Sequence, residues 1–190
     1  MRIRLLCIGK IKEKYLQAGI TEYVKRLGPF AKLEISELDE ERMPENPSAA
    51  EKAQALEREG ERLLKQVKNG SALVLLDVAG KNLASEELAR FMADLSVQGQ
   101  SDITFIIGGA FGVSPALQKA AHLRLSFSRM TFTHQMVRLL LVEQIYRAFK
   151  INRGEPYAPD SKYHLIFQTN FYIIGTHYFI SQLISGGLFS

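Results

Sequence analysis

The sequence contains a single cysteine and no tryptophan. One cysteine cannot form an internal disulfide, and because Cys7 lies in an apolar run we expect a buried, inert thiol in a reducing compartment. The four histidines are scattered, and together with Cys7 they show none of the spacings of a zinc site. The first residues are basic, but their apolar core is too short for a secretory signal, so we expect a first strand and a cytoplasmic location.

The sequence also lacks the common motifs of phosphate binding and nucleophilic catalysis. Its glycine-rich stretch, Gly108–Gly112, matches neither the G-x-G-x-x-G fingerprint nor a P-loop, because no Lys-Ser/Thr pair follows it. The G-x-S-x-G motif of α/β-hydrolases does not occur. A generic α/β nucleotide-binding enzyme is therefore a distant alternative.

The composition is that of an ordinary globular domain. The chain has 190 residues, of which 46% are hydrophobic and 23% are charged. It is long enough for one domain with a substantial core and too short for two ordinary ones. The formal net charge of +4 permits a nucleic-acid partner without requiring one.

Short apolar segments alternate with amphipathic ones along the chain. The expected N-caps of three helices are Ser48, which forms a capping box with Glu51, then Ser85 and Thr133. We predict strands at residues 3–8, 32–36, 72–78, 103–107 and 123–127, and helices at residues 14–27, 49–68, 86–97, 115–121 and 134–151. This alternation predicts an α/β fold with a mostly parallel sheet and helices on both faces.

The stretch Thr104–Pro115 is the centre of the predicted site. It is typical of a buried strand, a glycine-rich turn and a helix start, with Ser114 as the N-cap and Pro115 at the first helical position. The glycines permit positive φ angles and let a ligand approach the backbone. Ligands of α/β proteins bind at such strand ends, although a purely structural turn explains a glycine pair equally well.

Three loops follow apolar strands, after Leu76, after Ile107 and after Phe127. If these strands are parallel neighbours, the loops meet at one end of the sheet and form one pocket. The pocket would contain few acids or bases, namely Asp77, Ser128, Thr131 and His134.

Six segments of the sequence resemble those of a known protein family. The part from residue 105 to residue 151 is the most specific, because it is long and its motifs follow one another in a fixed order. The segments are Leu5–Lys10, Glu22–Leu27, Leu76–Asp77, Phe105–Gly112, Leu125–Arg138 and Glu143–Ile151. Over residues 1–157 the chain resembles the RlmH family of small SPOUT-class methyltransferases. This resemblance implies methylation of N3 of a pseudouridine in the 23S RNA of the large ribosomal subunit, with S-adenosyl-L-methionine as the cofactor.

The same resemblance has consequences for architecture and partners. It implies a deep trefoil knot at the C-terminal end of the α/β fold, and a homodimer in which each site is completed by the partner chain. The substrate would be ribosomal RNA in the assembled 70S particle, and no membrane partner is expected. By matching position, eight residues would contact the cofactor: Leu76, Gly108, Phe127, Ser128, Arg129, Met130, Thr131 and Phe132.

The catalytic candidates are His134, Arg138 and Tyr157. N3 of pseudouridine carries a proton that must leave, so a base or a stabiliser of the developing anion would help. Packing at a helix N-terminus explains His134 equally well, because the helix dipole disfavours a cation there. An ion pair with a neighbouring carboxylate explains Arg138 equally well, and Glu143 and Arg147 have the i,i+4 spacing of a helix-surface pair.

The C-terminal part departs from the family pattern. In relatives a histidine and a basic residue follow the tyrosine that matches Tyr157, and this tail completes the partner's site. Here Ala158 follows Tyr157, and the pair Tyr163-His164 comes only six residues later. Either tyrosine is a candidate for the tail's role. A second hypothesis is therefore a SPOUT-like RNA-binding protein with impaired catalysis.

Residues 158–190 are expected to form an atypical apolar extension beyond a methyltransferase domain at residues 1–157. Residues 165–190 carry no charged side chain, and their length would span a bilayer. Their polar residues and the pair Gly186-Gly187 make them a poor span. Three interpretations stay open: a packed extra element, a membrane-associating segment, or an extension without a selected role, which we favour.

Overall fold

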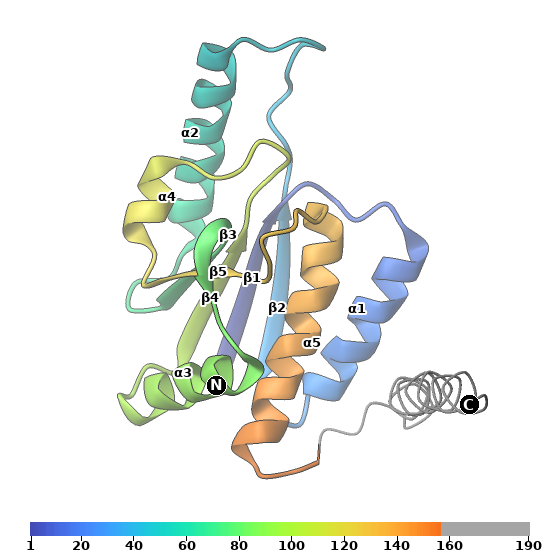
Figure 1. The fold of residues 1–190 in the computed structure, drawn as a ribbon, viewed down its shortest axis with the longest axis vertical. Helices are drawn as coiled ribbons and strands as arrows, with labels where there is room; N and C mark the ends of the chain where they lie inside the picture. Colours follow the sequence, from blue (N-terminus) through green and yellow to red (C-terminus); the bar gives the residue numbers. More distant parts are fainter. Residues whose placement is uncertain (157–190) are drawn as a thin grey trace, which may run out of the picture. The chain divides into compact units, whose positions relative to one another are not determined.

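The computed structural model describes residues 1–156 and shows one parallel five-stranded sheet (Figure 1). The strand order is β2-β1-β4-β3-β5, and every neighbouring pair is parallel. The strands are β1 (Arg2–Ile8), β2 (Lys32–Leu38), β3 (Ala72–Asn82), β4 (Asp102–Ile107) and β5 (Leu123–Ser126). Residues Met1–Glu155 form one compact unit.

Helices cover both faces of this sheet. One face carries α1 (Lys14–Leu27), α3 (Ser85–Val97) and α5 (His134–Asn152), and α5 packs against both other helices. The opposite face carries α2 (Ala49–Gln66) and α4 (Pro115–Ala120), which lie side by side in Figure 1. The predicted α/β architecture with helices on both faces is confirmed.

The central strands each contain a continuous apolar stretch, residues 5–8, 72–76 and 105–107, because both of their faces are buried there. Alternate side chains of β1 enter different cores: Ile3, Leu5 and Cys7 face α1, α3 and α5, whereas Leu6 and Ile8 face α2 and α4. Cys7 is fully buried, as expected, and burial raises the pKa of its thiol to about 12. The thiol is therefore protonated in the folded protein.

The predicted elements are all present, with differences at their ends. β3 continues to Asn82, because a register shift between Leu76 and Lys81 lets it pair with β5 a second time. The prediction that Ser85 caps a helix is wrong. Ala84 occupies the N-cap position, and the Ser85 hydroxyl instead donates a hydrogen bond to Gln144 Oε1 at 2.8 Å. The Ser48–Glu51 capping box is confirmed, with Glu51 N 3.2 Å from Ser48 Oγ.

Residues 1–156 contain neither a membrane-spanning helix nor a metal-binding cluster of side chains. None of their helices combines the length and the apolar character that crossing a bilayer requires. No cluster of histidine, cysteine, aspartate and glutamate side chains within them is arranged to hold a metal ion. The proposed extension at residues 158–190 lies outside the described residues.

Candidate functional site

A cavity of about 780 Å³ opens at the carboxyl ends of β4 and β5 and beside the part of β3 where its register shifts. Its walls come from the three loops that the sequence predicts to meet, those after Leu76, after Ile107 and after Phe127. Seven of the eight predicted cofactor-contacting residues line it: Leu76, Gly108, Phe127, Ser128, Met130, Thr131 and Phe132. The eighth, Arg129, is exposed and is not among the lining residues.

The glycine-rich turn after β4 is closed by its own backbone. Gly112 N donates a hydrogen bond to Gly109 O at 3.2 Å, and Gly112 has a φ of +102°. A Cβ at Gly108 would lie 2.4 Å from Gly112 O. The absence of a side chain at residue 108 therefore permits closure of the turn itself. That the same bare Gly108 also leaves room for a ligand to approach stays a prediction.

The segment after Leu76, which is the irregular part of β3 between Leu76 and Lys81, is held by Asp77. Its Oδ2 accepts hydrogen bonds from Arg124 Nε at 2.9 Å and from a terminal nitrogen of the same guanidinium at 2.7 Å. Its Oδ1 accepts from Ala79 N at 3.0 Å. A Cβ at Gly80 would lie 2.6 Å from Arg124 O, so the loop approaches β5 closely. Asp77, a candidate acid or base, is thus engaged in ordering the cavity wall.

The loop from residue 127 to residue 133 leads from β5 to α5. Ser126 Oγ donates to Ser128 O at 3.0 Å, and Met130 N donates to Ser128 Oγ at 3.0 Å. Thr133 then caps α5 as predicted, because its hydroxyl accepts a hydrogen bond from Met136 N at 3.3 Å. Short local hydrogen bonds therefore fix a loop whose side chains are largely exposed.

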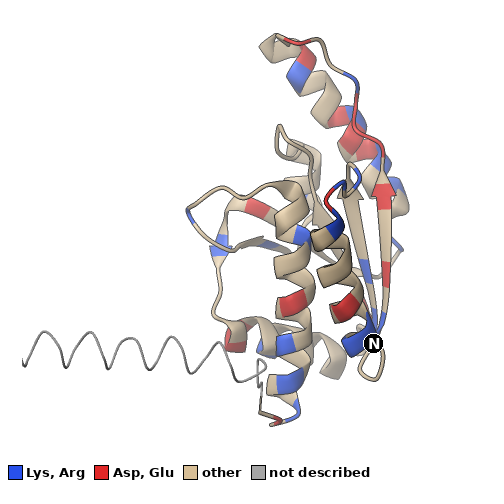
Figure 2. Cartoon of the chain, turned by 90° about the vertical axis from the view of Figure 1, so that its right-hand side faces the viewer, with Lys and Arg blue, Asp and Glu red and all other residues tan. Residues whose placement is uncertain are grey.

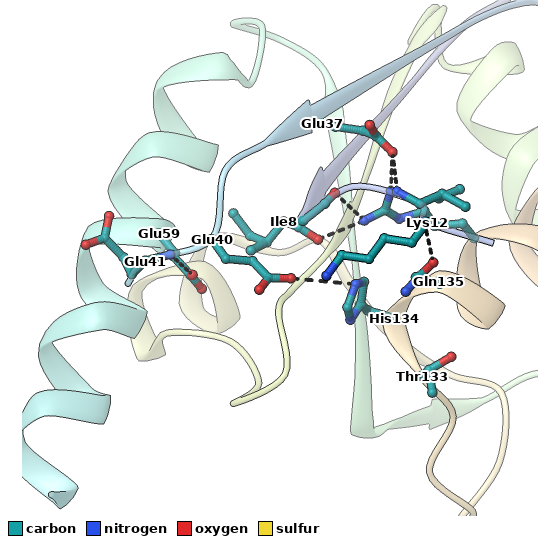
Figure 3. Close-up of polar contacts among 12 residues, drawn as sticks. Ile8, Lys12, Glu37, Glu40, Glu41, Glu59, Thr133, His134 and Gln135 are labelled. Atoms are coloured by element: carbon teal, nitrogen blue, oxygen red, sulfur yellow. Dashed lines mark hydrogen bonds and ion pairs between the residues drawn. The ribbon is translucent and has the colours of Figure 1, made fainter. Parts of the chain in front are cut away.

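His134, the first residue of α5, lines the cavity. Its Nε2 lies 3.7 Å from Glu40 Oε1, and Figure 3 shows Lys12 and Gln135 beside this pair. Burial and the nearby Arg138 lower the pKa of His134, the Glu40 carboxylate partly offsets them, and Lys12 lowers it slightly further. The imidazole is therefore mainly neutral near pH 7, where it can accept a proton.

Arg138 lies outside the cavity lining and is fully buried. One terminal nitrogen donates to Glu37 Oε1 at 2.6 Å, and the other donates to the carbonyl oxygens of Ile8 at 2.8 Å and Gly9 at 2.7 Å. The interpretation of Arg138 as part of an ion pair is thus what the structure shows. The guanidinium fastens the ends of β1 and β2 to the first turns of α5.

The structure treats the other candidate residues of the sequence differently. Glu143 and Arg147 form the expected i,i+4 pair at 2.7 Å. Tyr157, Tyr163 and His164 lie outside the described residues. The sequence reasoning assigned no role to Phe111 or Val78, although both line the cavity and are exposed. An exposed apolar residue has no signature in one sequence, because buried strands and turns contain the same residue types.

The chemistry of the lining favours a nucleoside without phosphate groups. Among the residues of 1–156 that line the cavity there is no lysine or arginine, and Asp77 is the one carboxylate. These residues offer no side-chain cation to bind the phosphate groups of a nucleotide. A positively charged ligand, in contrast, would not be repelled by a lysine or arginine among them. The volume lies within the range of small-molecule sites. The residues present therefore fit S-adenosyl-L-methionine, a cationic nucleoside.

Comparisons with known proteins agree with this geometry. A family model described as "Predicted SPOUT methyltransferase" matches residues 1–158. The chain is 54% identical over 157 residues to a ribosomal RNA large subunit methyltransferase H of Clostridioides difficile, covering 83% of this chain and 99% of that protein. The protein of the same name from Carboxydothermus hydrogenoformans is 52% identical over 157 residues, with the same coverage. The cavity, its three loops and these matches together show that the chain belongs to the SPOUT methyltransferase family.

Proposed function

We propose that this protein methylates N3 of a pseudouridine in the ribosomal RNA of the large subunit, with S-adenosyl-L-methionine as the methyl donor. The observation that carries the proposal is the convergence of three segments on one cavity, to whose lining the described part of the chain contributes no lysine or arginine. Relatives that are 52–54% identical bear the name ribosomal RNA large subunit methyltransferase H. The net charge of +4 is compatible with an RNA partner.

The cofactor would be held by Leu76, by the Gly108–Gly112 turn and by the loop from Phe127 to Phe132. When bound, it supplies a methyl group on a positively charged sulfur. The chain's task is then to position the substrate and exclude water. Hydrogen bonds that Asp77, Ser128 and Gly112 make within their own loops keep the backbone groups of all three loops in fixed places.

We assign His134 as the base that accepts the proton of N3. It lines the cavity, and its lowered pKa leaves the ring neutral and able to accept a proton. Arg138 is a positioning residue, because its guanidinium contacts Ile8, Gly9 and Glu37 rather than the cavity. It holds α5 at the place where His134 faces the cavity.

A homodimer with a composite site, acting on the assembled 70S ribosome, belongs to the same proposal. Tyr157 would contribute to the partner's site. The sequence Tyr157-Ala158, which replaces the tyrosine-histidine pair of relatives, favours a second candidate function. In that case the protein would bind ribosomal RNA without transferring a methyl group.

Charge on the described surface is mixed. Figure 2 shows lysines and arginines interspersed with acidic residues along the long helix α2 and around β1 and β2. Arg58 and Arg62 on α2, for example, both pair with Glu41. We therefore expect RNA recognition to depend on a few side chains at defined positions rather than on one uniformly basic face.

The test is methyl incorporation into ribosomes purified from a strain that lacks the enzyme, followed by mapping of the modified nucleotide. Incorporation at N3 of a pseudouridine in the large-subunit RNA is the expected result. Binding of the ribosome without incorporation would support the second function. Tighter binding of a phosphorylated nucleotide than of S-adenosylhomocysteine would contradict both.

A further inference from the structure

Exposed apolar side chains are concentrated at the mouth of the cavity. Six large hydrophobic residues of the described chain are exposed, and four of them line this cavity: Val78, Phe111, Met130 and Phe132. The other two, Tyr15 and Val97, are not among its lining residues. Phe111 leaves 50% of its surface in water although it belongs to a closed turn. An aromatic ring held rigidly in solvent beside a binding cavity is available to a ligand.

Phe111 is paired with a cation from a different element. The ammonium of Lys52, on the first turn of α2, lies 5.6 Å from the centroid of the Phe111 ring. Within residues 1–156 this ammonium forms no ion pair with a carboxylate. Lys52 is therefore a cation whose charge is still available at the edge of the cavity.

Both members of this pair have fixed positions. The capping box of Ser48 and Glu51 orders the start of α2. Further along α2, a Cβ at Gly60 would lie 2.2 Å from Ser114 Oγ, so the helix is in close contact with the segment that follows the glycine-rich turn. The Gly109–Gly112 bridge fixes the turn that carries Phe111. The aromatic ring and the ammonium are thus held by two elements that are packed together.

An exposed aromatic ring with an adjacent cation has the chemistry that single-stranded RNA requires. Unpaired bases stack on aromatic side chains, and lysine contacts the phosphate of the same or the next nucleotide. A target base that enters a cavity must leave its helix, which also unstacks its neighbours. Acidic groups lie close by, because Glu59 Oε2 is 3.4 Å from the Cβ position of Gly109. The ring of Phe111, rather than a broad basic surface, is therefore the main anchor.

We propose that Phe111 is a stacking platform for an RNA base that flanks the target nucleotide, and that Lys52 contacts the phosphate beside that base. This inference rests on the proposed function, since the cavity must be the place where an RNA nucleotide is bound. It gives the exposed side chain of Phe111 a substrate-binding role in the same turn whose backbone is assigned to the cofactor. The main competing occupant of the same surface is a second copy of this chain.

The test compares Phe111→Ala, Phe111→Tyr, Lys52→Ala and the control Val97→Ala in the full-length protein. Val97 is 87% exposed and does not line the cavity. For each variant we would measure the Kd and KM for ribosomes from a strain lacking the enzyme, the Kd for S-adenosylhomocysteine and the oligomeric state. Loss of one stacked base weakens binding by roughly 5- to 150-fold, and loss of one phosphate contact lowers the salt dependence of the Kd by about one power of salt concentration.

We expect Phe111→Ala to raise Kd and KM for ribosomes by that factor while Phe111→Tyr and Val97→Ala match the wild type. The oligomeric state should be unchanged, and any loss of S-adenosylhomocysteine affinity should be smaller than the loss of ribosome affinity, because the turn's backbone is kept. Phe111→Ala with wild-type ribosome affinity would overturn the proposal, and so would a change in oligomeric state or a loss of cofactor affinity as large as the loss of ribosome affinity. A wild-type protein that binds ribosomes but does not methylate them would refute the proposed function alone, because the binding comparison still tests Phe111.

Discussion

Arg138 on α5 donates a hydrogen bond of 2.7 Å to the carbonyl oxygen of Gly9, a residue 129 positions earlier in the chain. The contact joins the end of β1 to the start of α5. His134 lies against the same glycine, because a Cβ added at Gly9 would be 3.1 Å from His134 Nε2. Because His134 lines the cavity, the geometry of the candidate site depends on this buried guanidinium.

Replacing Arg138 with methionine is therefore expected to destabilise the fold by about 2–4 kcal/mol, because two backbone carbonyls and Glu37 lose a charged donor in a buried place. Urea unfolding measures the change. Arg58→Met is the control: its side chain is 58% exposed and 3.6 Å from Glu41, so the loss should be below about 1 kcal/mol. Equal losses in the two variants would show that Arg138 does not fasten α5 to the sheet.

The pKa of His134 is expected to lie below its ordinary value of 6.5, chiefly because the ring is partly buried and near Arg138. A proton NMR titration measures it directly. Since Glu40 raises this pKa, Glu40→Gln should lower it further. A His134 pKa above 6.5, or a rise in Glu40→Gln, would contradict the assignment of a neutral ring.

The same shift predicts a pH dependence of stability. Below pH 6.5 the unfolded chain binds a proton at His134 more readily than the folded chain does. The free energy of unfolding should therefore decrease as the pH falls from 6.5 toward the folded pKa, and it should change no further through this group below that value. His134→Gln should remove this component, as measured by urea unfolding at pH 7.5 and 5.5.

Gly108→Ala is expected to open the turn after β4, because its Cβ would lie 2.4 Å from Gly112 O. We predict at least about tenfold weaker binding of S-adenosylhomocysteine and a loss of about 1–3 kcal/mol of stability. Gly19→Ala is the matched control, since the nearest atom to its Cβ, at 3.0 Å, is the end of the flexible Leu139 side chain. Isothermal titration that gives wild-type affinity for Gly108→Ala would exclude the turn from the site.

Cys7 should be inert toward a thiol reagent in the folded protein. With a pKa of about 12, only about one thiol in ten thousand is ionised at pH 8, and the side chain is buried. Ellman's reagent should therefore react at the rate of unfolding, and one thiol per chain should react in urea. Fast reaction of the native protein would show that β1 is accessible.

Much of this fold was predictable from local signals. The apolar run in β4 is continuous because both its faces are buried, and such runs predict buried strands. Ser48 with Glu51, and Ser114 with Pro115, mark helix starts by their chemistry. The convergence of the three loops followed from the prediction of parallel strands, since parallel neighbours end at the same edge.

Contacts between residues far apart in the chain could not be predicted from local sequence patterns. The pairing of Arg138 with Ile8, Gly9 and Glu37 joins segments more than 100 positions apart, and only the sheet order brings them together. Gly108 lines the cavity, but its part in turn closure was not predictable, because a Cβ there would meet the backbone oxygen of Gly112, four residues later. A trefoil knot is implied for this chain by its family alone, since the threading of a chain has no periodic signature in the sequence.

We propose that the β3 segment after Leu76 and the loops after β4 and β5 together form the cofactor site. A crystal structure of the protein with S-adenosylhomocysteine tests it most directly. We expect the ligand in the cavity, in contact with Leu76, Gly108 and Met130, without a lysine or arginine from the cavity lining against it. A ligand bound anywhere else on the chain would contradict the claim.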